Sequence, residues 1–428
     1  MKNKNRKFWL ALTVFSLMGQ IAWVVENMYF NVFIYKMFNA SAADISLMVG
    51  ASAVAAALTS VFMGALSDKI GKRKLFICAG YVAWGLSVFS FVLLKKETLT
   101  LLFPAASAVS LGISLTVVLD CVMTFFGSTA NDAAFNAWLT DSTDSTNRGK
   151  AEGINAMMPL VAILAVFGGF MAFDLNEASS WTAIFAIIGI LTLACGIIGF
   201  FIIREPQIKP AEGGYLSTIL YGFRPSTVRE NMPLYTTLAL FVLFNTSIQI
   251  FMPYLILYYE VSLKMANYVL IMAPAIIIAS IATALWGRVY DKRGFGYCVF
   301  FALAWLCVGY VVLFCFKNTA LVFIGSLLMM CGYLAGMAVF GAKIRDCTPE
   351  GKAGALQGVR IFSQVLIPGI IGPFIGKTVL KNAETIVNSD GTESFVPNVG
   401  IFAAALAVCI VLVAVMLIIN RRKTKNNK

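Results

Sequence analysis

The chain has 428 residues, of which 59% are hydrophobic and only 13% are charged. A soluble domain carries about 25% charged residues, so this composition excludes an ordinary soluble enzyme, a coiled coil and a disordered regulator. The chain contains no His, which removes the most frequent general base and a common metal ligand. Its nine Cys are scattered without a CxxC pair, so we expect no metal site, no redox site and no cofactor.

Apolar runs long enough to cross a bilayer recur along the whole chain. A membrane-spanning helix needs about 20 such residues. The runs lie near 8–30, 43–66, 75–94, 99–140, 154–173, 181–203, 234–258, 265–286, 298–316, 319–340, 356–376 and 399–419. They predict an all-α integral membrane protein in which twelve transmembrane helices form two pseudo-symmetric six-helix bundles. The bundles are 1–203 and 234–428, the second ending in a short basic tail, and a polar cytoplasmic linker joins them at 204–233.

The net charge of +12 comes from 33 basic and 21 acidic residues. If both termini are cytoplasmic, twelve spans place most basic residues on the cytoplasmic side, as the positive-inside rule requires. The exceptions are Lys36, Lys95, Lys96, Lys264, Lys317, Lys377 and Lys381. A thirteenth span would move the basic tail outside. The basic excess thus indicates a multi-pass protein of the cell membrane that contacts lipid, rather than a nucleic-acid-binding protein.

An internal repeat supports this count. The loop after the second helix and the loop after the eighth align, so that Gly64, Asp68 and Gly71 correspond to Gly287, Asp291 and Gly294. Farther on, 135–153 aligns with 340–358, but the first half carries additional residues between its two motifs. We assign this surplus to an extended outer loop or interfacial segment within 95–116, and place the fourth helix near 117–140.

The stretch GALSDKIGKRK (64–74) resembles the loop signature of the major facilitator superfamily, and the resemblance covers essentially the whole chain. It implies a transporter that works by alternating access, with a latch closing the cytoplasmic side. The residues expected in this latch and its second copy are Gly64, Asp68, Gly71, Arg73, Arg148 and Asp291. In a duplicated transporter the solute site is expected at mid-depth between the halves.

The subfamily is indicated by the fourth helix. The stretch 127–153 is similar to sodium- or proton-coupled transporters of glycosides and sucrose. The helix at 43–66 carries only Asp44 in place of their acidic pair, which leaves the coupling ion open between H⁺ and Na⁺. The helix at 154–173 lacks the GPxxGG element of drug–proton antiporters, which disfavours efflux.

Three acids fall inside the predicted spans, where an ionisable side chain costs several kcal/mol and is a functional candidate by default. They are Glu26, Asp120 and Asp132. Asp132 lies deepest, whereas Asp120 is near the outer face, where it is explained by reaching water. We expect Glu26 and Asp132 to take up and release the coupling proton. The alternative for Glu26 is a structural acid paired with an Arg.

Polar residues accompany these acids at helical spacing. Asp120, Asn131 and Asp132 belong to a stripe with Thr124 and Ser128 that recurs every three or four residues, so they share one face. The stripe either lines a wet cavity or packs against another helix.

Further candidates for solute binding lie on three other helices. Asn27 and Asn31 lie on one face of the first helix, and Glu26 aligns in the repeat with Gln249. Arg360 and Gln364 lie one turn apart, and Arg360 either reaches the surface or holds an anionic or polyhydroxylated solute.

The sequence therefore predicts a monomeric secondary active transporter that imports a small polar organic solute, such as a sugar or glycoside, with H⁺ or Na⁺. It has no GxxxxGK[ST] loop for ATP and no acid–base set of an enzyme. Two alternatives stay open, namely proton-coupled efflux of amphipathic compounds and a nutrient receptor that does not transport. The identity of the solute cannot be determined from these residues.

Overall fold

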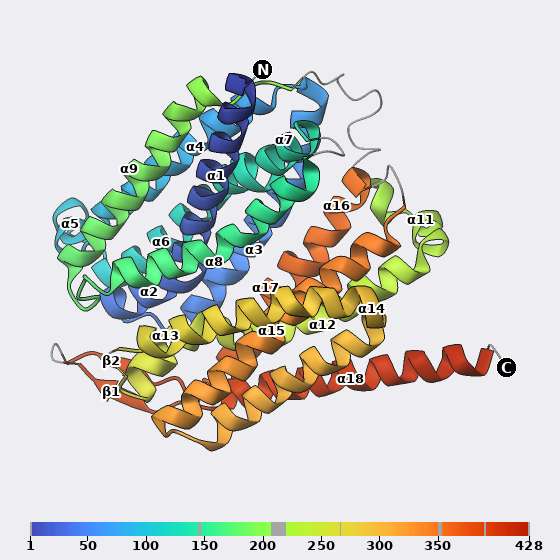
Figure 1. The fold of residues 1–428 in the computed structure, drawn as a ribbon. Coiled ribbons are helices and arrows are strands. Elements are labelled where there is room, and N and C mark those ends of the chain that lie inside the picture. The colour runs from blue at the N-terminus through green and yellow to red at the C-terminus, as the bar shows by residue number, and fades with distance from the viewer. Residues whose placement is uncertain are drawn as a thin grey trace. The chain divides into compact units, whose positions relative to one another are not determined.

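A computed structural model describes residues 2–143, 147–206, 220–265, 267–349, 353–388 and 391–426. The described chain is almost wholly helical and divides into two compact units, unit 1 (Met1–Tyr221) and unit 2 (Gly222–Lys428) (Figure 1). The division falls inside the stretch predicted as the linker, 204–233, of which 207–219 lie outside the described residues.

The regular elements in the described part of unit 1 are all helices. In chain order they are α1 (Lys2–Val24), η1 (Val25–Tyr29), α2 (Phe30–Phe38), α3 (Ala42–Ile70), α4 (Arg73–Ser90), η2 (Phe91–Leu93), α5 (Lys96–Leu102), α6 (Ala108–Gly127), η3 (Ser128–Phe135), α7 (Asn136–Asp141), α8 (Arg148–Phe170) and α9 (Ala178–Ile202). The segments η1 and η3 are π-helical turns within longer helices, and η2 is a 3₁₀ turn.

Unit 2 adds one small hairpin to its helices. Its elements are η4 (Tyr221–Phe223), α11 (Pro225–Glu230), α12 (Met232–Phe251), η5 (Met252–Tyr254), α13 (Leu255–Leu257), η6 (Tyr258–Ser262), α14 (Val269–Cys315), α15 (Thr319–Cys347), α16 (Ala353–Ile361), η7 (Phe362–Leu366), α17 (Ile367–Val379), β1 (Thr385–Val387), β2 (Glu393–Phe395) and α18 (Gly400–Asn426). The strands β1 and β2 pair antiparallel, with Ile386 opposite Ser394.

Twelve membrane spans are present in the described residues. Eleven helices are long and apolar enough to cross a bilayer, and one of them, α14, has 47 residues, about twice the length needed. Gly294 interrupts α14 with a left-handed φ of 73°. The rings of Trp286 and Trp305 lie 4.7 Å apart, whereas 19 residues of straight helix would separate them by about 28 Å. The chain therefore reverses at Gly294, and α14 supplies two spans.

The fourth helix begins earlier than predicted. The sequence places it near 117–140, but α6 begins at Ala108 and continues through η3 and α7 to Asp141. Ser107 caps α6 by accepting a hydrogen bond from the backbone N–H of Ser110, a start signal that the hydrophobicity of the run obscured. The surplus chain in the first half includes a separate seven-residue helix, α5.

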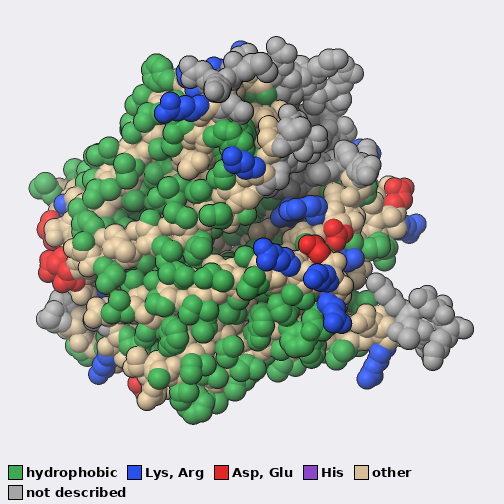
Figure 2. Space-filling view, in the orientation of Figure 1, with side chains coloured by type: hydrophobic (Ala, Val, Ile, Leu, Met, Phe, Trp, Pro, Cys, Tyr) green, Lys and Arg blue, Asp and Glu red, His purple; other side chains and the backbone are tan. Residues whose placement is uncertain are grey.

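Neighbouring helices approach closely at glycines. A Cβ on Gly189 of α9 would lie 2.8 Å from the backbone nitrogen of Phe89, at the end of α4. In unit 2 a Cβ on Gly309 would lie 2.5 Å from the backbone nitrogen of Met329. Small residues permit such contact between membrane helices. Hydrophobic side chains cover much of the face shown in Figure 2, as expected of a surface that faces lipid.

Candidate functional site

A π-helical turn in the first transmembrane helix positions Glu26. The helix runs without a break from α1 through η1 to α2, and η1 adds one residue to the turn that contains Glu26. Such turns are frequent at functional sites because they redirect side chains relative to the α-helical pattern. The Glu26 side chain points into unit 1, and the residue is only 7% exposed.

Two hydroxyl groups from other helices bind the Glu26 carboxyl group. Ser52 of α3 donates to Oε1 over 2.7 Å, and Thr124 of α6 donates to the same oxygen over 2.9 Å. The two hydroxyl oxygens lie 2.8 Å from each other. The first, second and fourth transmembrane helices thus converge on one carboxyl group. Ser52 was not among the predicted residues, because nothing in its small-residue run distinguishes it from a helix-packing serine.

Asp120 belongs to the same cluster. It lies one turn before Thr124, is 2% exposed, and is within electrostatic range of Glu26. The expectation that Asp120 reaches water is therefore wrong, because the neighbouring helices enclose it. One oxygen on each carboxyl group, Oε2 of Glu26 and Oδ1 of Asp120, is buried without a hydrogen-bond partner. We call Glu26, Ser52, Asp120 and Thr124 the carboxyl cluster.

The predicted polar stripe of the fourth helix has more than one set of contacts. Asp132 accepts a hydrogen bond from Ser128 over 3.0 Å, and Asn131 accepts one from the Tyr81 hydroxyl over 3.1 Å. These residues lie in η3, whose π-helical geometry departs from the rotation of 100° per residue on which the predicted stripe was based. Asp132 is nevertheless within electrostatic range of Glu26.

The two asparagines of the first helix differ in exposure. Asn27 is exposed and donates to the carbonyl of Trp23 over 2.8 Å. Asn31 is 1% exposed and donates to the carbonyl of Asn27 over 3.1 Å, which leaves its buried Oδ1 without a partner. Of the two, only Asn27 is accessible to a solute in this structure.

Charge determines what the carboxyl cluster can do. Among the described residues, neither Glu26 nor Asp120 forms an ion pair with Lys or Arg. Two ionised carboxylates in one buried site repel each other. The cluster is therefore suited to hold a proton, or a small hard cation bound through carboxylate and hydroxyl oxygens. No group of three acidic or Cys side chains in the described part is placed to hold one metal ion.

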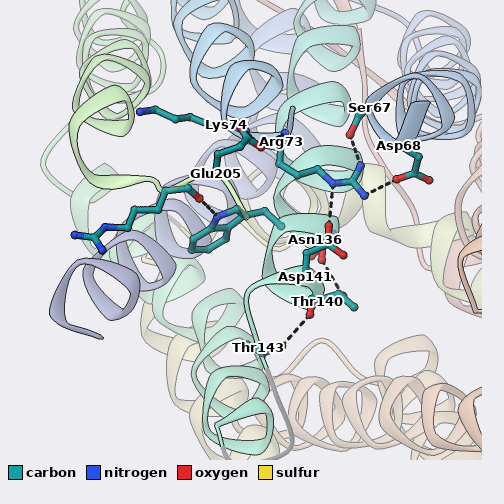
Figure 3. A network of polar contacts seen from close by, with 11 residues as sticks. Ser67, Asp68, Arg73, Lys74, Asn136, Thr140, Asp141, Thr143 and Glu205 are labelled. Atoms are coloured by element: carbon teal, nitrogen blue, oxygen red, sulfur yellow. Dashed lines mark hydrogen bonds and ion pairs between the residues drawn. The ribbon is translucent and has the colours of Figure 1, made fainter. Parts of the chain in front are cut away.

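A second polar network surrounds Arg73 at the start of α4 (Figure 3). Arg73 is 5% exposed. Its guanidinium group contacts Asp68 at 2.5 Å and Asp141 at 3.0 Å, and donates to Ser67 over 2.5 Å. Gly71, with φ of 69°, ends α3 and turns the chain into α4. Arg73 thus joins the ends of α3 and α7.

The first residues after α9 join this network. Glu205 accepts hydrogen bonds from the backbone N–H groups of Arg73 and Lys74, over 2.5 and 3.2 Å, and so caps the N-terminus of α4. Trp138 donates to the carbonyl of Arg204 over 2.9 Å. These contacts could not be predicted from the sequence, because Glu205 lies more than 130 residues from Arg73 and Lys74. The side chain of Arg148, predicted as a partner of Asp68, lies outside the described residues.

The second copy of the motif is simpler. Gly294 matches Gly71 in its left-handed φ, as the repeat predicts. Tyr290, which occupies the place of Ser67 in the repeat, donates directly to Asp346 over 2.6 Å. Asp291 is exposed. This region therefore contacts an aspartate in the last turn of α15, the tenth membrane helix, directly and without an intervening arginine.

The remaining predicted residues lie in unit 2 or near the Arg73 network. Gln249 on α12, Arg360 on α16 and Gln364 in η7 are each half-buried. A Cβ on Gly372 would lie 2.7 Å from the carbonyl carbon of Gln249, so α17 packs directly on this part of α12. Gly64 is half-buried on α3, and a Cβ there would lie 3.8 Å from the Cβ of Ala133 in η3.

Comparison with known proteins agrees with this architecture. A family model described as Major Facilitator Superfamily matches residues 8–373. The fold is similar to a nucleoside transporter, NupG (12% identity, TM-score 0.69, 95% of this chain and 98% of that one). It is also similar to the xylose transporter XylE from E. coli (15%, 0.67, 95% and 97%) and to a bacterial homolog of the human lysosomal transporter Spinster (16%, 0.66, 97% and 96%). No curated protein matches the chain.

Proposed function

Because the chain belongs to the Major Facilitator Superfamily and is a multi-pass membrane transporter, we propose that it imports a small polar organic solute, such as a sugar or glycoside, together with H⁺ or Na⁺. It acts as a monomer in the cell membrane with both termini in the cytoplasm. Glu26 is the principal coupling group, and Asp120 and Asp132 interact with it electrostatically.

The carboxyl cluster is the observation that carries this proposal. Its two buried carboxyl groups have no basic partner among the described residues, so their combined charge is tolerable only when a proton or cation neutralises part of it. The same groups hydrogen-bond across three helices. Loading or releasing the cation therefore changes both the charge and the contacts that hold α3 and α6 to the first helix. A carboxyl group with these properties couples a cation to a conformational change.

The solute class is supported by polar side chains in both units. Asn27 in unit 1 is exposed, and Gln249, Arg360 and Gln364 in unit 2 are half-buried. Amide and guanidinium groups hydrogen-bond to hydroxyl-rich solutes. Two proteins with similar folds are named as nucleoside and xylose transporters, which are transporters of polar solutes of this kind.

We assign the Arg73 network to gating. Asp68, Gly71 and Arg73 form one contact set at an end of unit 1, and the salt bridges can break when the helices separate. On this proposal, Asp68→Asn lowers the transport rate while the protein is still produced in normal amounts.

The test is uptake into proteoliposomes under an imposed pH gradient or an imposed sodium gradient. Sugars, glycosides, nucleosides and amino acids are screened first by thermal shift, with and without sodium, and the hits are then used as radiolabelled solutes. We expect one gradient to drive accumulation, and Glu26→Gln to reduce accumulation to the equilibrium level while solute exchange continues. Glu177→Gln, which changes an exposed acid of the same unit, serves as the matched control.

Three results would contradict parts of the proposal. Accumulation by Glu26→Gln equal to that of the unaltered protein would remove Glu26 as the coupling group. Expulsion of amphipathic compounds driven by an inward proton gradient would replace import by efflux. Binding of a solute with no uptake under any gradient would identify a receptor.

A further inference from the structure

A cavity of about 180 Å³ opens at the end of unit 1 opposite the Arg73 network. It lies where α2 and η2 end and where α9 begins. Its position is separate from the carboxyl cluster, and no residue of that cluster lines it. Sites that enclose a whole drug-sized ligand usually have 300–1,000 Å³, so this cavity accommodates a smaller group.

The floor of the cavity is aromatic and rigid. Phe33, Phe91, Trp181 and Phe185 line it, and each is at most 1% exposed. The ring centroids of Phe33 lie 5.3 Å from Trp181 and 4.9 Å from Phe185. Interlocked rings of this kind keep the shape of the cavity fixed without a ligand.

The rim of the cavity is basic. Three half-buried lysines line it, namely Lys36 from the last turn of α2 and Lys95 and Lys96 at the start of α5. Glu97 supplies the one acidic side chain of the lining, so the formal charge of the rim is positive. These three lysines are among the seven basic residues that the predicted topology leaves outside the cytoplasm. Positive charges brought together in a partly desolvated place favour a bound anion.

The surface beside the cavity is apolar. Leu101 and Leu102 of α5 and the following Phe103 are 80%, 61% and 49% exposed. Exposed large apolar side chains next to lysines are typical of the boundary between lipid chains and headgroups, where Lys stems lie along apolar surface and the ammonium groups reach the polar layer.

We propose that this cavity binds the phosphate headgroup of an anionic phospholipid such as phosphatidylglycerol. The three lysines contact the phosphate, the aromatic floor closes the cavity beneath the headgroup, and the acyl chains run past the exposed leucines of α5. Asn176 and Thr182, which also line the cavity, provide hydrogen-bonding groups for the glycerol hydroxyls. A lipid is favoured over free phosphate because the apolar surface of α5 adjoins the charged rim.

The test measures lipid binding to the purified full-length protein in detergent by native mass spectrometry and by thermal shift. The probes are dioctanoyl phosphatidylglycerol, dioctanoyl phosphatidylcholine and inorganic phosphate. We expect phosphatidylglycerol to bind and to raise the Tm, while the other two probes change little. Lys36→Gln, Lys95→Gln and Lys96→Gln combined should weaken phosphatidylglycerol binding by roughly a hundredfold, from about fivefold per lysine.

Two further variants test whether binding depends on the positive charge of this cavity or on the net charge of the protein. The same lysines changed to Arg should retain binding, since the positive charge is kept. Lys317→Gln, Lys377→Gln and Lys381→Gln combined remove three lysines assigned to the same side of the membrane but located in unit 2, and should leave binding unchanged.

Several outcomes would overturn the proposal. An equal Tm shift with inorganic phosphate would show an anion site that does not select lipid. Equal binding of phosphatidylcholine would show that the charge of the headgroup is not recognised. Equal loss of binding in the unit 2 variant would show a nonspecific charge effect.

Discussion

Arg73 has two carboxylate partners, and the structure predicts that they contribute unequally to stability. The side chain of Asp68 is 46% exposed, whereas that of Asp141 is 27% exposed and that of Arg73 only 6%. Water screens the Asp68 pair more strongly, although its contact is the shorter one. Asp141→Asn should therefore destabilise unit 1 more than Asp68→Asn.

The magnitudes follow from this exposure. Asp68→Asn should cost at most about 1 kcal/mol, the usual range for an exposed pair. Asp141→Asn should cost about 1–2 kcal/mol, after discounting a charged hydrogen bond for its partial exposure. The double variant leaves a buried guanidinium group without any carboxylate, which costs about 3–5 kcal/mol. The double variant should thus lose more than the two single variants added together.

The assay is unfolding of the purified protein in detergent, followed by Trp fluorescence, for the single and double variants. Adding Arg73→Met to the double variant removes the uncompensated charge and should restore part of the loss. The reasoning is refuted if Asp68→Asn costs as much as Asp141→Asn. It is also refuted if the double variant equals the sum of the single ones, because Arg73 would then not depend on either carboxylate.

Three further substitutions probe the backbone and the helix contacts. Gly294→Ala places a Cβ at φ 73° and ψ −179°, a conformation that is almost confined to glycine, and should cost about 1–3 kcal/mol in unfolding free energy. Gly287→Ala, with open space around it, should be neutral or slightly stabilising. Gly189→Leu should overpack α9 against α4, lower the unfolding free energy by about 1–3 kcal/mol and so lower the Tm. Gly168→Leu, which has open space around it, should leave the Tm unchanged. Glu205→Ala removes the cap of α4 and should cost about 1 kcal/mol in the same unfolding assay, and a neutral result would show that solvent replaces this cap.

Much of the architecture could be predicted because membrane insertion depends on local composition. Each span must satisfy its own backbone hydrogen bonds, so it appears in the sequence as a long apolar run. The structure confirms the twelve predicted spans, with α14 supplying two of them. The correspondence of Gly71 with Gly294 was also predictable, because a positive φ selects glycine at both copies of the repeat.

The predictions were wrong where a helix changed its geometry and where a capping residue set its first turn. The start of the fourth helix was placed nine residues too late, because an apolar run does not show where Ser107 begins the helix. The single face expected for Asp120 and Asp132 assumed regular α-helix, and η3 departs from that geometry between residues 128 and 135. A π turn adds one residue locally and leaves little trace in composition.

The sequence by itself determined the class of this protein, its number of spans and the three acids that lie in the membrane. Those properties depend on local composition and on the high cost of charge in lipid. Only the tertiary structure decided which side chains meet those acids and which residues contact the loop between α3 and α4, such as Ser52 with Glu26 and Glu205 with the start of α4. These contacts join helices far apart in the chain, and their hydrogen bonds depend on ångström-scale positions that residue spacing does not specify.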